Sequence, residues 1–336
     1  MKFYNIWLTR KCNLRCKYCY EGEKTSQADF PEDYIDDLIG FIQKNSRNER
    51  VINVNFHGGE PLLRFETMKK ICESLSRIEQ KVFYSMTTNG LLLNQEILDF
   101  IVQNQFELSV SVDGTEFAHD LNRIDINGNG SYKDVILQLK KVLVSGIEPR
   151  IRMTVCSSTI PYLYEGVEIL KNLGCGNIVA APDFCDLSWT EENIGKLKKQ
   201  LYKIEEKMQD TSCEYIFFEN NPMRKKGTCK GGIAESCIDV DGCVYPCTFA
   251  VGNPQFCIGN IKNGIRNEKI ESLMEINQRK NPVCRGCTYE DYCVSTRCKL
   301  MNQMVTGDCL TPSPTICALE NLIYMLQKDK PVTACD

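Results

Sequence analysis

The sequence predicts a partial (β/α)6 barrel, an incomplete relative of the TIM barrel, followed by a small cysteine-rich domain. Roughly the first 180 residues alternate short apolar, β-branched runs with longer segments of helical periodicity, the pattern of a parallel sheet wrapped by helices. After residue 212 the composition changes, and most of the twenty cysteines lie there. We therefore predict a barrel domain at 1–212 and a cysteine-rich domain at 213–336.

Six apolar runs are the strand candidates, and helical patterns separate them. The strands are expected at 3–9, 52–56, 82–87, 107–112, 150–155 and 177–181. Apolar residues at helical spacing predict helices that include 32–45, 66–79, 131–145, 161–173 and an amphipathic, solvated 191–209. Parallel α/β folds gather their binding loops at the carboxyl ends of the strands, so motifs that directly follow a strand are functional candidates.

Composition excludes several classes of function. The 336 residues include 40 basic and 44 acidic side chains, for a net charge of −4, so we expect neither nucleic acid nor a membrane surface as a partner. There is no export signal or run of transmembrane length, which predicts a cytoplasmic protein. With only two histidines, Ser-His-Asp triads and HExxH zinc sites are excluded.

Cys12, Cys16 and Cys19 form a C-x3-C-x2-C motif on a short loop. Three thiolates at this spacing suit a [4Fe-4S] cluster in which one iron has no protein ligand. Structural zinc prefers four protein ligands, usually in two separated pairs, and no fourth Cys or His is near this motif. The loop therefore predicts a cluster with one open coordination position.

Three further motifs follow predicted strands: FHGGEPLL at 56–63, TTNGLLL at 87–93 and SVSVDG at 109–114. Together with CNLRCKYC they resemble the radical S-adenosylmethionine (SAM) superfamily over most of the N-terminal half. The resemblance implies that the open iron binds the amino and carboxylate groups of SAM, and that the sulfonium bond is cleaved to a 5'-deoxyadenosyl radical. It also implies an external one-electron donor of the flavodoxin or ferredoxin type.

The resemblance implies a set of SAM-binding residues: Tyr18, Gly58, Gly59, Glu60, Asn89, Ser111 and Arg123. Tyr18 matches an aromatic position beside the adenine, although an ordinary core aromatic is the alternative. Glu60 matches a position that holds the SAM ammonium, and the two glycines before it let the backbone approach a ligand. Ser111 matches a ribose-binding position, and Arg123 an arginine that reaches the SAM carboxylate. Asn89 either contacts SAM or only forms a turn.

Two polar residues near this set are interpreted as structural. Asp113 in the SVSVDG segment is expected to form a turn, and His119 is expected to anchor a loop. No catalytic base is assigned.

The C-terminal cysteines form a second signature: Cys229, then Gly242-CVYP-Cys247, then Cys284-x2-Cys287-x5-Cys293-x4-Cys298, and Cys317. It resembles the SPASM domain, which carries two auxiliary [4Fe-4S] clusters in many peptide-modifying radical SAM enzymes. The family has three residues before the fourth cysteine of the central run, where this chain has four, VSTR.

The resemblance implies two ligand sets. The first cluster would be held by Cys229, Cys247 and Cys298, with Cys237 or Cys243 as the fourth ligand. The second would be held by Cys284, Cys287, Cys293 and Cys317. A zinc ribbon on Cys284, Cys287, Cys293 and Cys298 is the alternative.

A deoxyadenosyl radical abstracts hydrogen from unactivated carbon, and two further clusters can pass on an electron or ligate a substrate thiolate. We therefore expect a peptide maturase that forms a thioether or carbon-carbon cross-link. Anaerobic sulfatase maturases, which oxidise Cys or Ser to formylglycine, are the runner-up. They carry an aspartate base directly after the cysteine that matches Cys247, where this chain has Thr248.

The sequence also bears on how a peptide would be recognised and on two non-enzymatic alternatives. The sequence begins with the first predicted strand, so recognition of a peptide leader would need a separate protein or another surface. An iron-sulfur electron carrier, or a zinc-ribbon scaffold, would also be rich in cysteine. Neither would need the GGE turn or the ribose serine.

Overall fold

The computed structural model describes residues 1–19, 21, 27–208, 212–218 and 224–328. Over these residues one sheet of eleven strands has the order β11-β10-β9-β8-β1-β2-β3-β4-β5-β6-β7. Its strands are β1 Lys2–Thr9, β2 Val51–Gly58, β3 Lys81–Thr88, β4 Glu107–Ser111, β5 Arg150–Val155, β6 Asn177–Pro182, β7 Glu214–Phe217, β8 Glu235–Ile238, β9 Cys243–Tyr245, β10 Gly259–Asn260 and β11 Gly264–Ile265.

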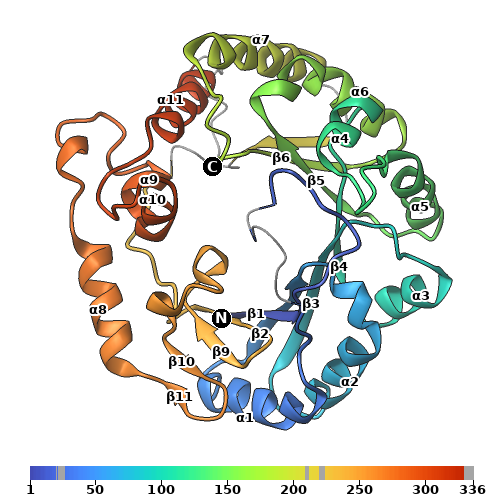
Figure 1. Cartoon of the computed structure of the whole chain (residues 1–336), viewed down its shortest axis with the longest axis vertical. Coiled ribbons are helices and arrows are strands. Elements are labelled where there is room, and N and C mark those ends of the chain that lie inside the picture. The colour runs from blue at the N-terminus through green and yellow to red at the C-terminus, as the bar shows by residue number, and fades with distance from the viewer. Residues whose placement is uncertain (20, 22–26, 209–211, 219–223, 329–336) are drawn as a thin grey trace.

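Helices follow the strands and cover the outer face of the sheet, which curves into an open ring (Figure 1). The described α-helices are α1 Ile35–Asn45, α2 Phe65–Leu75, α3 Gln95–Gln103, α4 Glu116–Asn122, α5 Tyr132–Val144, α6 Leu163–Asn172, α7 Glu191–Met208, α8 Asn267–Gln278, α9 Val294–Arg297, α10 Lys299–Thr306 and α11 Pro314–Lys328, of which α8 to α11 belong to the C-terminal segment. None of the described helices is both long and apolar enough to cross a bilayer.

The predicted partial barrel is confirmed. The six expected strands are all present within two residues of the expected bounds, and neighbours from β1 to β6 pair in parallel. The expected helix at 66–79 ends earlier, at Leu75, where Ser76 Oγ bonds to the carbonyl of Glu73. The expected helix at 161–173 begins at Leu163, because Pro161 lies in a preceding 3-10 turn.

The sheet continues beyond the six predicted strands on both sides. β7 pairs in parallel with β6, and β8 pairs in parallel with β1, so that Phe3 lies opposite Glu235. From β8 the C-terminal segment crosses the gap in the ring, and α11 returns to pack against α7 (Figure 1). The domain division at residue 212 stays a prediction, since β7 lies beyond it yet completes the barrel side of the sheet.

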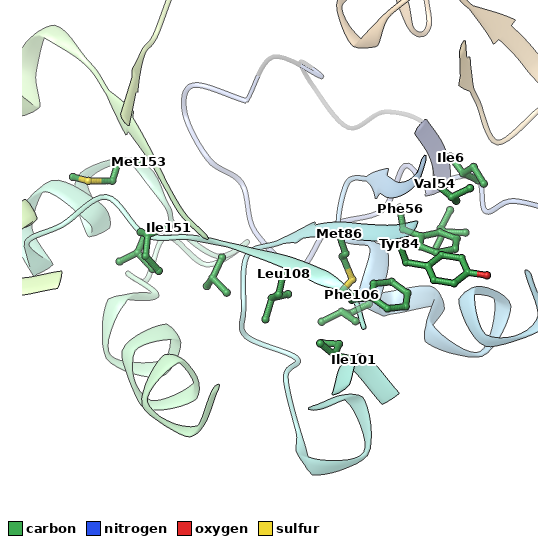
Figure 2. Packing of buried hydrophobic residues seen from close by; sticks show 14 of the residues in the cluster. Ile6, Val54, Phe56, Tyr84, Met86, Ile101, Phe106, Leu108, Ile151 and Met153 are labelled. Atoms are coloured by element: carbon green, nitrogen blue, oxygen red, sulfur yellow. The ribbon is translucent and has the colours of Figure 1, made fainter. Parts of the chain in front are cut away.

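The main core lies between the sheet and its helices. Phe56, Tyr84 and Phe106 stack with ring centroids 5.1 to 6.3 Å apart. Figure 2 shows these rings beside Met86, with Ile101 of α3 below them. A smaller apolar cluster joins Trp7 of β1 to the C-terminal segment through Tyr245, Leu273 and Leu300. The cysteine-rich segment therefore shares apolar packing with the barrel.

One close contact sets the distance between a helix and the sheet. At the end of β4, Gly114 has a φ of +89° and meets Gly166 of α6, where a Cβ would stand 2.7 Å from the Gly114 Cα. Gly40 of α1 is also mid-helix, but it is exposed and has open space where its Cβ would lie. Close packing against the sheet thus requires a glycine at position 166, whereas no close contact requires one at position 40.

Gly166→Ala should lower the free energy of unfolding by about 1–3 kcal/mol, because the new methyl group forces α6 away from the sheet. Gly40→Ala should raise it by about 0.5–1 kcal/mol through helix propensity. Denaturant unfolding of the two variants, followed by circular dichroism, checks the opposite signs. Equal effects from both substitutions would contradict the packing argument.

Candidate functional site

A cavity of ≈ 1270 Å³ lies inside the ring of strands. It is lined by all ten residues that the sequence predicts for the SAM-binding cluster and for SAM: Cys12, Cys16, Tyr18, Cys19, Gly58, Gly59, Glu60, Asn89, Ser111 and Arg123. Nine of them follow a strand or end one, as parallel α/β topology requires, whereas Arg123 directly follows helix α4. Residues more than a hundred positions apart thus reach one space.

The three cysteines of the loop after β1 face one another. Burial raises the pKa of Cys16 to about 11, and the neighbouring thiols of Cys12 and Cys19 add to the rise, while Arg123 opposes it. Backbone bonds from Arg15 to Ile124 and from Lys17 to Asn122 tie the loop to the end of α4. Three half-buried thiols lie on one loop that backbone hydrogen bonds hold in place. This arrangement fits a [4Fe-4S] cluster in which one iron has no protein ligand.

The GGE turn holds the start of this loop. A Cβ on Gly58 would stand 2.2 Å from the Thr9 oxygen, and one on Gly59 would stand 2.1 Å from the Lys11 oxygen. The amides of Gly59 and Glu60 donate to these same two oxygens at 2.9 Å. The glycines are therefore explained by backbone packing against the cysteine loop, a role that their local sequence does not indicate.

Glu60 connects the GGE turn to the TTNG turn after β3. Its fully buried carboxylate accepts from the Thr88 hydroxyl at 2.7 Å and from the Asn89 amide at 2.8 Å. The Asn89 side chain in turn donates to Asn13 at 2.7 Å and lies 3.8 Å from the Cys12 sulfur. Asn89 thus orients the cysteine loop, which is more than the turn formation that its sequence context suggests.

Arg123 is buried against an anion from its own chain. Its Nε and Nη2 donate to the two oxygens of Asp113 at 3.0 and 3.2 Å, and its guanidinium lies 5.2 Å from the centre of the Tyr18 ring. The Tyr18 hydroxyl donates to the same carboxylate. Burial alone would lower the pKa of Arg123, but Asp113 raises it, so the guanidinium stays charged. Asp113 thus positions both predicted SAM-binding side chains, beyond the turn role expected for it.

His119 has a structural environment. Its Nδ1 accepts from the Asp113 amide at 3.3 Å, and its Nε2 lies 3.0 Å from the Ser131 hydroxyl, which donates to the Arg123 carbonyl. Burial lowers the pKa of His119 to about 4, so the ring is neutral near pH 7. A neutral, fully bonded ring holds the segment that carries Arg123.

Comparison with known families settles the class of the protein. Residues 6–173, half of the chain, match the model of the radical SAM superfamily. The chain belongs to this superfamily. It is therefore a radical SAM enzyme, a family that uses SAM and a [4Fe-4S] cluster, and the three thiols and the cavity described above fit both.

Several curated proteins are similar to this enzyme. It is 25% identical over 84% of both chains to the cysteine-type anaerobic sulfatase-maturating enzyme of Clostridium novyi. It is 27% identical to the uncharacterized protein MJ0907 of Methanocaldococcus jannaschii, over 88% of this chain and 98% of the relative. The radical SAM cyclopropyl synthase TigE of Paramaledivibacter caminithermalis is 22% identical over 75% of this chain and 58% of its own length.

Solved structures share the fold of the whole chain. The enzyme anSMEcpe with bound AdoMet has a TM-score of 0.78 at 19% identity, covering 98% of this chain and all of its own. SuiB of Streptococcus suis, bound to its precursor peptide SuiA, has a TM-score of 0.71 at 15% identity, covering 94% of this chain and 75% of its own. The overall architecture is thus that of SPASM-type radical SAM enzymes.

Near the C-terminus, three cysteines of the first predicted auxiliary set line a second cavity of ≈ 290 Å³: Cys229, Cys247 and Cys298. Burial raises the pKa of Cys247 to about 12, and the thiols of Cys298 and Cys229 add to the rise. Cys237 is an electrostatic neighbour of Cys247, whereas Cys243 neighbours Cys257. Of the two candidates for the fourth ligand, Cys237 is therefore the one beside the set.

The second predicted set also comes together. The thiol of Cys284 has Cys287 and Cys317 as electrostatic neighbours, and Cys293 has Cys284. Cys298 lies with the first set instead, which does not suit a zinc ribbon. No three His, Cys, Asp or Glu side chains among the described residues are grouped tightly enough for a single metal ion. A cubane spreads its ligands over four irons, so its thiols stand farther apart.

Cys16→Ala should abolish cleavage of SAM to 5'-deoxyadenosine, because the loop then offers only two thiolates to the cluster. Chromatography of the nucleoside products of anaerobically reduced protein measures this. Cys72→Ala is the control, since Cys72 is buried in α2 away from the cavity. Deoxyadenosine production by the Cys16 variant at the rate of the control would contradict the assignment.

Cys237→Ser should lower the iron content by up to about four atoms per chain, or alter the paramagnetic spectrum of one cluster, because it removes the candidate fourth ligand. Cys243→Ser is the matched control and should keep the iron and the spectrum of the wild type. Iron analysis with electron paramagnetic resonance distinguishes them. The reverse pattern would make Cys243 the ligand.

Proposed function

We propose that this enzyme is a peptide maturase that uses the deoxyadenosyl radical to abstract hydrogen from a peptide and to form a thioether or carbon-carbon cross-link. One observation carries the proposal. Thr248 and Phe249, which directly follow Cys247, line both the main cavity and the cavity of the first auxiliary set. A cluster at that set would therefore adjoin the substrate.

The redox balance of cross-linking explains why this adjacency matters. Joining a thiol to a carbon removes two hydrogens in total. One leaves as an atom to the deoxyadenosyl radical, and the other leaves as a proton and an electron. A cluster held by Cys229, Cys237, Cys247 and Cys298 would supply an acceptor for that electron. A cluster held by Cys284, Cys287, Cys293 and Cys317 would supply a second electron acceptor.

Residues of this chain have defined tasks in the proposal. Glu60 would accept from the SAM ammonium, Ser111 would bond to the ribose, and Tyr18 would lie against the adenine. Arg123, held by Asp113, would direct its remaining donors at the SAM carboxylate. The sheet and its helices keep bulk water from the radical on the outer side.

Formylglycine formation is the second candidate, and one observation favours it: the similarity to sulfatase-maturating enzymes extends over 84% of both chains. One observation speaks against it. The residue directly after Cys247, which lines the main cavity, is Thr248 instead of an aspartate, and its hydroxyl cannot act as a general base near neutral pH. Cross-linking is therefore the first choice.

The proposal includes partners. The substrate is a peptide, in line with the peptides bound to anSMEcpe and SuiB. An external donor of the flavodoxin or ferredoxin type supplies the electron for SAM cleavage. A separate protein or another surface of this enzyme recognises the leader of the peptide, and the reaction takes place in the cytoplasm.

The test is mass spectrometry of a Cys-containing peptide encoded beside this gene, after incubation with the reduced enzyme and SAM. Loss of two hydrogens is expected, and the Cys16→Ala protein should give none. The Cp18Cys peptide, which is bound in a solved structure of anSMEcpe, should be incubated in parallel as a comparison. We expect it to stay unmodified. Replacement of its thiol by a carbonyl would instead establish the second candidate.

A further inference from the structure

Lys299 is a buried lysine in the C-terminal segment, directly after Cys298. Its side chain is 1% exposed. The ammonium donates to the side-chain oxygen of Asn281 and, at 2.8 Å, to the carbonyl of Thr296. In the described part of the chain no carboxylate pairs with it, and the nearby charged side chain of Arg279 is a second cation.

The surroundings of Lys299 are thiols of both auxiliary sets. The thiols of Cys284 and Cys298 are electrostatic neighbours of its ammonium. Cys284 belongs to the second set and Cys298 to the first, so the ammonium has a thiol of each set as a neighbour. Cys309, which belongs to neither set, is a third neighbour.

Asn281 connects this lysine to the second set. Its side chain accepts from Lys299 and is also a hydrogen-bond partner of the Cys284 thiol. A second bond, 3.1 Å long, runs from its Nδ2 to the carbonyl of Ser295. A continuous path thus joins Cys298, through Lys299 and Asn281, to Cys284.

The extra residue between Cys293 and Cys298 helps to build this site. The four residues VSTR form the single turn α9, Val294–Arg297. Two of their carbonyls, those of Ser295 and Thr296, accept from Asn281 and Lys299. The departure from the SPASM spacing therefore supplies the polar walls that hold the ammonium.

A fully buried ammonium costs several kcal/mol unless an anion compensates it. Amide and carbonyl oxygens provide partial charges only. A [4Fe-4S] cluster with four thiolate ligands is an anion, and charges interact strongly in a poorly polarisable interior. An anionic cluster on each side would supply the compensation that the described residues lack.

We propose that Lys299, with Asn281, forms a cationic bridge between the two auxiliary clusters and raises the reduction potential of both. The inference rests on the proposed auxiliary clusters and names the residue that tunes them. Reduction adds one electron to a cluster that is already negative, and a fixed neighbouring cation favours the reduced form. Lys299 is thus a positioning and tuning residue, which touches no substrate.

The test is a redox titration of the anaerobically reconstituted enzyme, followed by electron paramagnetic resonance. Lys299→Met removes the charge at similar volume. Asn281→Asp keeps the lysine but places a carboxylate against it. This second variant tests the inference if Lys299→Met does not bind its clusters. Lys280→Met is the matched control, because Lys280 is exposed and the change in net charge is the same.

In both test variants, the ratio of reduced to oxidised auxiliary cluster at a fixed potential should fall at least tenfold, about 59 mV for one electron. The control and the SAM-binding cluster should not change. Unchanged auxiliary potentials in variants with wild-type iron content would overturn the inference, as would an equal shift in the control.

Iron analysis of the wild type separates this inference from the proposed function. Iron for a single cluster would refute the auxiliary clusters and the bridge together. Cross-linking of the peptide with unchanged potentials in the variants would refute the bridge alone.

Discussion

The close approach of two backbone segments, Thr9–Lys11 and Gly58–Glu60, is the constraint on which the site depends. No Cβ fits at either glycine, and the two amide bonds at 2.9 Å connect the end of β1 to the end of β2. This contact fixes where the cysteine loop begins. The loop then crosses to the end of α4, and its three cysteines line the cavity.

Buried charge distinguishes the two halves of the molecule. In the barrel, Arg123 has Asp113 as its anion, and the pair also fixes Tyr18, so this part of the site is electrostatically complete as the chain folds. In the C-terminal segment, Lys299 donates only to an amide oxygen and a carbonyl oxygen within the described residues. A buried ion pair needs only the two side chains of the folded chain. A buried cation without an anionic side chain indicates instead that an anion binds beside it.

Prediction from sequence succeeded where a feature is local. Strands β1 to β6 have long apolar runs, and the helices between them have clear periodicity, so both were found. Strands β7 to β11 contain between two and four residues each, too few for a periodic pattern to be detected. They form because neighbouring strands offer hydrogen bonds, as β1 does for β8. The purpose of Gly58 and Gly59 was missed for the same reason, since their contacts lie some fifty residues away in the chain.

The order of residues by itself determined the superfamily, the six strand-helix units and the cysteines that can bind iron, because spacing along a loop or strand decides which side chains a local segment presents. Only the tertiary structure decided which distant groups meet. It placed Asp113 on Arg123, separated Cys237 from Cys243, and set Lys299 beside a thiol of each auxiliary set. Those pairings depend on how the sheet curves and how the C-terminal segment spans its gap, and no short stretch of sequence encodes either.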